Sequence, residues 1–269
     1  MIQLVAYDLD GTLVGRDLVL RPRVRAAIAR VRATGVRGCI VTGRMYQASL
    51  PYARELELDA PLVCYQGAAI VDPQTDEVLF DMPLPNATAL EVVEMAERDG
   101  MHVQLYRNDT YYCEQRNRFS DLYAHLSRVE PVVVPSLREL FGTSVATKAV
   151  VIADAPVAEQ YAKQLQEKLG KRAYVTRSYP EFVEILNPFV DKGEALEFVA
   201  ARLEIPIGNV LAIGDSWNDA PLLEAAGIGV AMGSAPGEIR VLADAVVADV
   251  EHDGVAEALD RYIPQDPSA

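Results

Sequence analysis

The chain has 269 residues, half of them hydrophobic, and a formal net charge of −14. This length can bury one large core, or a core with an inserted unit, and no apolar run reaches the length of a membrane span. The negative charge disfavours nucleic acids and anionic membranes as partners. The first residues do not have the basic and apolar regions of a secretion signal.

The cysteines indicate a reducing compartment. Cys39, Cys64 and Cys113 are odd in number and widely spaced. This pattern does not fit a disulfide framework, and the absence of Cys-x-x-Cys pairs and Cys/His clusters argues against a zinc site. We therefore expect a cytoplasmic protein with buried, reduced thiols.

The chain opens with an apolar segment, residues 4–7, that predicts a short buried strand and is followed by two carboxylates. A lone buried charge is costly, so the chain is expected to leave the sheet at Asp8. Asp8 and Asp10 can point at one place, where their repulsion calls for a cation or a shared proton. Their oxygens suit Mg²⁺. Considered without its neighbours, the dipeptide Asp10-Gly11 also fits an ordinary surface turn, which is the alternative.

A helix over residues 21–32 and a second apolar strand over 36–41 follow. This strand leads directly into Thr42-Gly43-Arg44. The Thr42 hydroxyl and the Gly43 amide can bind phosphate oxygens, and the N-terminus of a following helix would add to the attraction. Taken alone, the same tripeptide also fits a helix cap with a turn.

A third strand over 61–65 is followed by Gln66-Gly67-Ala68, and the pattern then changes. A hairpin is predicted around a turn between residues 72 and 77, and Asn86 is expected to cap the next helix. Adjacent strands separated by helices predict an α+β unit at about 83–187. Its strands are predicted over 102–106, 110–113, 146–153, 174–176 and 182–186, and its helices over 87–98 and 157–169.

The parallel pattern resumes near residue 187, and Lys192 begins a predicted helix. A cation is disfavoured at a helix N-terminus, so Lys192 is expected to pair with an anion and to neutralise crowded carboxylates. A surface lysine in a loop is the alternative.

A strand over 209–213 then leads into a third polar cluster, Gly-Asp-Ser-Trp-Asn-Asp. Asp215 can complete a cation site with Asp8 and Asp10, and Asp219 can return to the same face after one helical turn. A helix start with Asp and Asn caps is the alternative. A strand and turn over 229–233, a helix near 237–242, a short strand over 245–248 and a last helix from Val255 complete the predicted core.

Four strand-terminal motifs in this order resemble those of the haloacid dehalogenase-like superfamily. The motifs are Asp8-x-Asp10-Gly-Thr12, Thr42, Lys192 and Gly-Asp215-x-x-Asn218-Asp219. Thr-Gly-Arg is typical of the Cof-like branch with its type IIB cap, which usually has Asn where this chain has Gln66. The resemblance implies an α/β fold, with a Rossmann-like parallel-sheet core over 1–82 and 188–269. An α+β cap for substrate specificity is inserted at 83–187.

The resemblance also implies a Mg²⁺-dependent phosphatase that works through an aspartyl-phosphate. Asp8 would be the nucleophile and Asp10 the acid and base. The implied metal ligands are Asp8, Asp215 and the backbone carbonyl of Asp10. The implied phosphate-binding residues are Thr42, Gly43, Lys192 and Asn218, with support from Asp219, Arg44 and Thr12.

The cap is expected to select the substrate, a small phosphorylated metabolite and most naturally a sugar phosphate. The candidate contacts in the cap are Tyr106, Tyr111, Tyr112, Arg116, Arg118 and Arg177. Two alternative functions stay open: a phosphosugar mutase of the same superfamily, and a catalytically silent sensor of phosphometabolites. We expect a monomer or a homodimer.

Overall fold

The computed structural model describes residues 1–264, and its central feature is a five-stranded parallel sheet. The strands lie in the order β14 (Ala245–Val246), β13 (Ile228–Ala231), β12 (Val210–Gly214), β1 (Leu4–Tyr7) and β2 (Arg37–Ile40). All neighbours pair in parallel. β1 and β12 are short apolar runs buried on both faces, as central parallel strands require. The predicted parallel-sheet core is confirmed.

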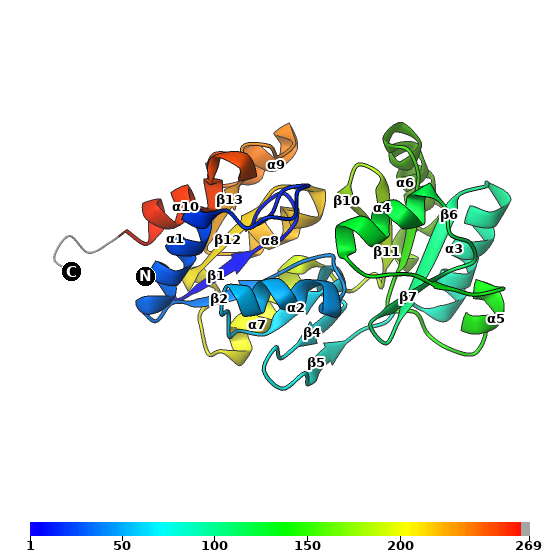
Figure 1. Ribbon diagram of the computed structural model, residues 1–269, viewed down its shortest axis with the longest axis horizontal. Coiled ribbons are helices and arrows are strands. Elements are labelled where there is room, and N and C mark those ends of the chain that lie inside the picture. Colours follow the sequence, from blue (N-terminus) through cyan, green and yellow to red (C-terminus); the bar gives the residue numbers. More distant parts are fainter. Residues whose placement is uncertain (265–269) are drawn as a thin grey trace.

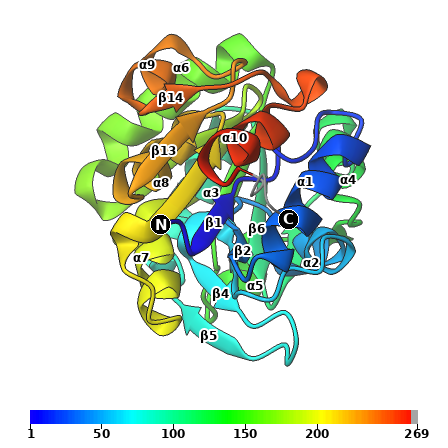
Figure 2. The same cartoon turned by 90° about the vertical axis from the view of Figure 1, so that its left-hand side faces the viewer.

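Helices cover both faces of this sheet (Figure 2). Val5 and Tyr7 belong to the apolar cluster that contains α1 (Pro22–Ala33), α2 (Tyr46–Glu55) and α10 (Gly254–Tyr262). Leu4 and Ala6 point to the other face, because side chains alternate along a strand. There they pack with α7 (Lys192–Arg202), α8 (Ala220–Ala225) and α9 (Gly237–Leu242).

Residues 102–186 contribute every strand of a second, six-stranded sheet, which lies at the opposite end of the molecule (Figure 1). Its order is β10 (Tyr174–Tyr179), β11 (Phe182–Leu186), β9 (Ala149–Ile152), β6 (His102–Arg107), β7 (Thr110–Cys113) and β8 (Val132–Val133). The pairs are antiparallel except for β7 with β8. We refer to residues 83–187 as the cap.

The two faces of the cap sheet have different partners. One face packs on α3 (Asn86–Arg98), α5 (Leu137–Phe141) and α6 (Ala155–Leu169). The other face carries Tyr106, Val150 and Phe182, which belong to the same apolar cluster as Tyr7 of the parallel sheet. α4 (Arg118–Ser127) also contributes to this cluster. The cap is therefore seated on the parallel-sheet core.

A third, antiparallel sheet joins β3 (Leu62–Cys64), β4 (Ala69–Val71) and β5 (Val78–Asp81), and it contains the predicted hairpin. The predicted cap of α3 is wrong: Asn86 is its first residue and Pro85 precedes it. Within residues 1–264 we find no helix with the length and hydropathy needed to cross a membrane.

Candidate active site

Neighbouring strands of the parallel sheet end in polar residues at one edge. Asp8 follows β1, Asp215 follows β12, and Thr42 comes shortly after β2. Tyr7 and Ile213 are level in the register, so the ends of β1 and β12 coincide. Parallel strands present their carboxyl ends on the same side of a sheet, which is where ligands bind in such folds.

Lys192 lies among the acidic residues at this edge. Its side chain is fully buried, and its Nζ donates to Asp8 Oδ1 at 2.5 Å and to Asp219 Oδ1 at 2.6 Å. The other oxygen of Asp219 accepts from the backbone N–H groups of Asp215 and Ser216, at 2.9 and 3.0 Å. One ammonium group thus ties β1 to the loop that follows β12.

The crowding of charges shifts the pKa values of these groups. Burial, and then the neighbouring Asp219, raise the pKa of Asp8 above its usual range, although Lys192 acts in the opposite direction. Burial and the Asp8 carboxylate raise the pKa of Asp215 well above its usual range. Burial lowers the pKa of Lys192, but Asp219 and Asp8 outweigh it and raise the pKa overall. The carboxylates therefore exceed the positive charge that Lys192 supplies.

The acidic groups have the composition and spacing of a cation site. Asp8, Asp215 and Asp219 each offer an oxygen, and these oxygens lie within 4.8 Å of one another. Lys192 and backbone amides occupy both oxygens of Asp219, which leaves Asp8 and Asp215 as the candidate side-chain ligands. Gly11 makes room, because a Cβ there would overlap the Asp215 carboxylate, and its φ of +86° favours glycine. Hard, negatively charged oxygen donors of this kind fit Mg²⁺.

The carboxylate of Asp10 is bound by other side chains. Arg44 donates from Nε and Nη2 to Oδ2 and Oδ1, at 2.7 and 2.5 Å, and the Tyr179 hydroxyl donates to Oδ1 at 2.7 Å. Burial raises the pKa of Asp10, but Arg44 and then Tyr179 outweigh it and lower the pKa overall. Asp10 is thus held as a carboxylate, and its backbone carbonyl remains as the group that it can offer to a cation.

Thr42 and Gly43 line the same pocket as Asp8. Thr42 is buried, and its Oγ1 accepts from the backbone N–H of Arg44 at 3.1 Å, so the hydroxyl hydrogen remains available for donation. Both residues therefore share a pocket with Asp8, and their phosphate contacts stay a prediction.

The expected attraction from the N-terminus of the following helix is wrong. The first N–H groups of α2, those of Tyr46 and Gln47, donate to the Asp109 carboxylate at 2.8 and 2.7 Å. Asp109 lies in the turn between β6 and β7. The cap therefore supplies the anion that caps this helix, because exposed N–H groups at a helix start attract any nearby carboxylate.

Thr12 and Asn218 complete the set of predicted residues. The Thr12 hydroxyl lies 3.4 Å from Asp215 Oδ1. Asn218 is 4% exposed, lines the pocket, and donates from Nδ2 to Gln66 Oε1 at 3.0 Å. Gln66 is fully buried and has a φ of +59°, a left-handed conformation that is uncommon for a side-chain-bearing residue.

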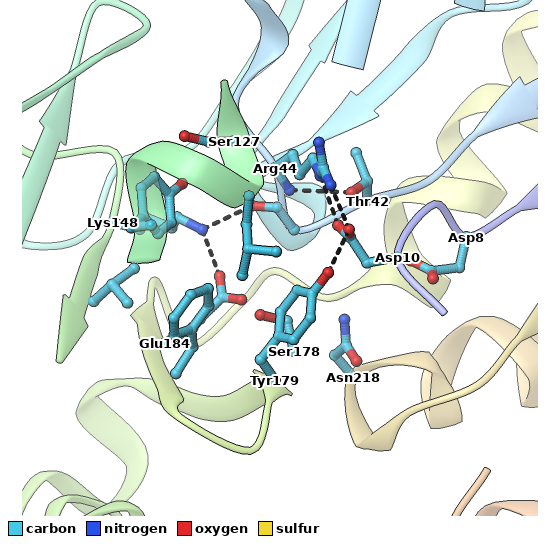
Figure 3. Close-up of a pocket in the computed structure, with 15 residues that line it drawn as sticks. Asp8, Asp10, Thr42, Arg44, Ser127, Lys148, Ser178, Tyr179, Glu184 and Asn218 are labelled. Carbon is cyan, nitrogen blue, oxygen red and sulfur yellow. Dashed lines mark hydrogen bonds and ion pairs between the residues drawn. The ribbon is translucent and has the colours of Figure 1, made fainter. Parts of the chain in front are cut away.

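The pocket above Asp8 is formed jointly by the core and the cap (Figure 3). Its free volume is about 30 Å³. The core contributes Asp8, Asp10, Thr42, Gly43, Arg44 and Asn218, and the cap contributes Tyr123, Leu126, Ser127, Lys148, Val150, Ser178, Tyr179, Phe182 and Glu184. Aromatic rings and two serines of the cap thus line the same pocket as Asp8 and Asp10.

The six cap residues chosen from the sequence are not among those that line this pocket in residues 1–264. Tyr106 and Tyr111 are fully buried and stack on each other with ring centroids 5.7 Å apart. Arg116 and Arg118 form surface ion pairs, and the Arg177 guanidinium lies over the Trp217 ring, 4.2 Å from its centroid. Tyr112 packs against Phe141.

Some of the cap residues that line the pocket were not predicted from the sequence, although they lie in a helix that the spacing of its apolar residues indicates. Phe119, Leu122, Tyr123 and Leu126 have helical spacing, and Asn117 is a good helix start, so α4 was predictable. No local pattern in the sequence indicated that Tyr179, Lys148 and Glu184 would line the pocket. Their positions follow from the pairing of β10, β11 and β9 and from how that sheet is seated on the core.

Replacing Lys192 with Met should lower the melting temperature by roughly 5–10 °C, because it leaves buried carboxylates uncompensated. Combining it with Asp219→Asn should recover part of the loss. Lys163→Met, which removes a lysine with a 72% exposed side chain, is the matched control and should change the melting temperature by at most about 2 °C. An unchanged melting temperature for Lys192→Met would contradict this account.

The family model for haloacid dehalogenase-like hydrolases matches residues 5–259. The pyridoxal phosphate phosphatase YbhA of Escherichia coli is 31% identical over 97% of this chain and 98% of its own. The 5-amino-6-(5-phospho-D-ribitylamino)uracil phosphatase YitU of Bacillus subtilis is 30% identical, over 96% and 97%. The crystal structure of a haloacid dehalogenase-like hydrolase from Bacteroides thetaiotaomicron is 27% identical with a TM-score of 0.85, covering 97% of this chain and 99% of that one. The chain therefore belongs to the haloacid dehalogenase-like hydrolases, in their Cof-like branch, and is a phosphatase.

Proposed function

We propose that this phosphatase is Mg²⁺-dependent and hydrolyses small phosphorylated metabolites through a phosphoryl group carried on Asp8. The observation that carries the proposal is the buried Asp8 carboxylate, held by Lys192 beside Asp215 at the end of β1. A carboxylate fixed in this way is oriented for attack on phosphorus instead of being free to rotate.

Asp8, Asp215 and the backbone carbonyl of Asp10 would hold the Mg²⁺ ion. When bound, the ion offsets the negative charge of the phosphoryl oxygens and of the crowded carboxylates. Lys192, the Thr42 hydroxyl, the Gly43 amide and Asn218 supply hydrogen-bond donors for the same oxygens.

The reaction proceeds in two displacements. An oxygen of Asp8 attacks phosphorus, the bond from phosphorus to the ester oxygen breaks, and the leaving oxygen takes a proton from Asp10. Asp10 then removes a proton from water, which attacks the phosphoryl group and releases inorganic phosphate with Asp8 regenerated. Arg44 and Tyr179 hold Asp10 ionised, which suits the second displacement. For the first, Asp10 has to be protonated, so at least one of these contacts has to loosen when substrate binds.

The cap surface of the pocket supports a small ester as the substrate. Tyr123 and Phe182 contribute aromatic rings to the lining of the pocket, and Ser127 and Ser178 contribute polar side chains. Rings pack against the C–H faces of a sugar or against a planar ring, and hydroxyls bind polar substituents. The relatives named above act on small phosphorylated compounds, and we propose the same class here, with sugar phosphates as the first candidates.

We also propose that the enzyme works in the cytoplasm, as a monomer or a homodimer. Cys39, Cys64 and Cys113 are free and buried, as in proteins kept reduced.

The proposal is tested by measuring phosphate release from a panel of phosphorylated metabolites, with Mg²⁺ and after chelation. Wild type should release phosphate only with the metal. The rate of release by Asp8→Asn should fall to the assay background, because a side-chain amide does not attack phosphorus as a carboxylate does. Asp121→Asn, on the cap surface, is the matched control and should keep full activity. Conversion of a phosphosugar without phosphate release would favour a mutase. Wild-type function retained in Asp8→Asn would favour a sensor.

Ser178→Val should raise the KM for the preferred ester about tenfold, because one methyl group replaces the hydroxyl and a second is added in a pocket with little free space. Arg118→Ala removes a surface side chain outside this pocket and should leave the ranking of substrates unchanged. Steady-state kinetics on the same panel measures both. A changed ranking in Arg118→Ala together with an unaffected Ser178→Val would show that substrate is selected elsewhere.

A further inference from the structure

A row of buried polar side chains connects the cap to Asn218. Lys148 and Glu184 are each 2% exposed, and the lysine Nζ donates to Glu184 Oε2 at 2.5 Å and to the Gly43 carbonyl at 2.7 Å. The other oxygen of Glu184 accepts from Gln66 Nε2 at 2.9 Å. Gln66 Oε1 in turn accepts from Asn218 Nδ2 at 3.0 Å. The row begins in the cap sheet and ends at the predicted phosphate site.

The chemistry of the row fixes the orientation of both amides. The Glu184 carboxylate only accepts, so Gln66 has to present its Nε2 to it and its Oε1 to Asn218. Asn218 then has to present its Nδ2, which uses one of the two N–H groups of that nitrogen and leaves the other free. Figure 3 shows the amide nitrogen of Asn218 on the side of the pocket that holds Asp10.

The packing around the row is tight and its burial is costly. A Cβ at Gly43 would overlap the Gln66 amide and lie 3.1 Å from Glu184 Oε1, so this glycine makes room for the contact. Burying an ion pair such as Lys148–Glu184 seldom stabilises a fold more than apolar residues of the same size would. Gln66 also has strained backbone, with a φ of +59°. Stability alone therefore does not explain why these residues occupy these positions.

We propose that Gln66 is a positioning residue, through which the seating of Glu184 and Lys148 on the core orients Asn218 to donate its second N–H to the substrate phosphate. This inference rests on the proposed function, because it assigns phosphate binding to Asn218. It means that the phosphate site is complete only while the cap is seated, since Glu184 belongs to β11 and Gln66 to the core.

The decisive variant is Gln66→Glu, which places two carboxylates face to face and removes the donor. It should reduce kcat/KM on the order of tenfold, and by the same factor for every ester, because all esters share the phosphate. The exchanged pair Gln66→Glu with Glu184→Gln should restore activity to within about threefold. The amide introduced at position 184 would donate to the carboxylate introduced at position 66 and still accept from Lys148. Gln66→Met, which has similar length and no hydrogen bonds, should reproduce the loss without charge repulsion.

Two controls separate positioning from folding. Gln104→Met removes another fully buried glutamine, one that donates to Tyr106 outside the row, and should keep kcat/KM. In an Asn218→Ala background, Gln66→Glu should cause no further loss, because its effect passes through Asn218. An equal loss in that background, or a loss restricted to some esters, would overturn the proposal.

Binding of inorganic phosphate tests the row independently of turnover. Trp217, the single tryptophan of the chain, precedes Asn218, so its fluorescence can follow a phosphate titration. Phosphate should bind about tenfold more weakly to Gln66→Glu and regain its affinity in the exchanged pair. Equal affinity of wild type and Gln66→Glu, or no binding by wild type, would overturn the inference. If wild type binds phosphate but hydrolyses no ester, the proposed function fails while the role of Gln66 stays testable.

Discussion

The pairing of Lys192 with Asp8 and Asp219 is the interaction on which the rest of the site depends. Lys192 is the first residue of α7, where the helix dipole disfavours a cation, and it is fully buried. Asp191 offsets part of this cost by accepting from the first N–H groups of the helix, at 2.8 and 2.9 Å. The buried carboxylates supply the remaining compensation, so changing the lysine alone leaves buried charge unpaired and costs stability.

The same ion pairs explain how the fold brings the acidic residues of the site together. α7 packs on one face of the parallel sheet, and its first residue reaches the ends of β1 and the loop after β12. One side chain of α7 therefore holds both the nucleophile candidate and the loop after β12. Holding the acidic groups together before any ligand arrives concentrates negative charge at one place, which a divalent cation then balances.

The cap covers the site and bonds to the core at several points. Tyr179 bonds to Asp10, Lys148 to the Gly43 carbonyl, and Asp109 to the start of α2. The free volume of about 30 Å³ leaves little room between the lining side chains, so we expect the cap to shift when a phosphorylated metabolite enters. Closure then excludes bulk water and strengthens every hydrogen bond to the phosphoryl group.

The sequence predicted the residues that follow parallel strands, and it did so for a physical reason. Asp8, Thr42 and Asp215 each come directly after a short apolar run, and the ends of parallel strands meet at one edge whatever the details of packing. Lys192 was predictable because its charge conflicts with its place in a helix. These residues needed only local patterns and one rule of topology.

The cap residues were not predictable in the same way. Tyr106, Tyr111 and Tyr179 all lie on strands of the cap, yet only Tyr179 bonds to Asp10, because the seating of the cap sheet decides which rings reach the pocket. Asp109 lies in a turn with no local sign that it caps a helix some sixty residues earlier. Contacts between distant segments depend on tertiary packing, which the spacing of residues along the chain does not specify.

The most direct test of the account is to stop the enzyme with acid during turnover and map the phosphoryl group by mass spectrometry. If Asp8 is the nucleophile, the peptide that contains it should carry an acid-stable, base-labile phosphoryl group, formed and lost at rates consistent with phosphate release. Rapid phosphate release with no phosphoryl group on Asp8 at any time, or with the group on another residue, would contradict it.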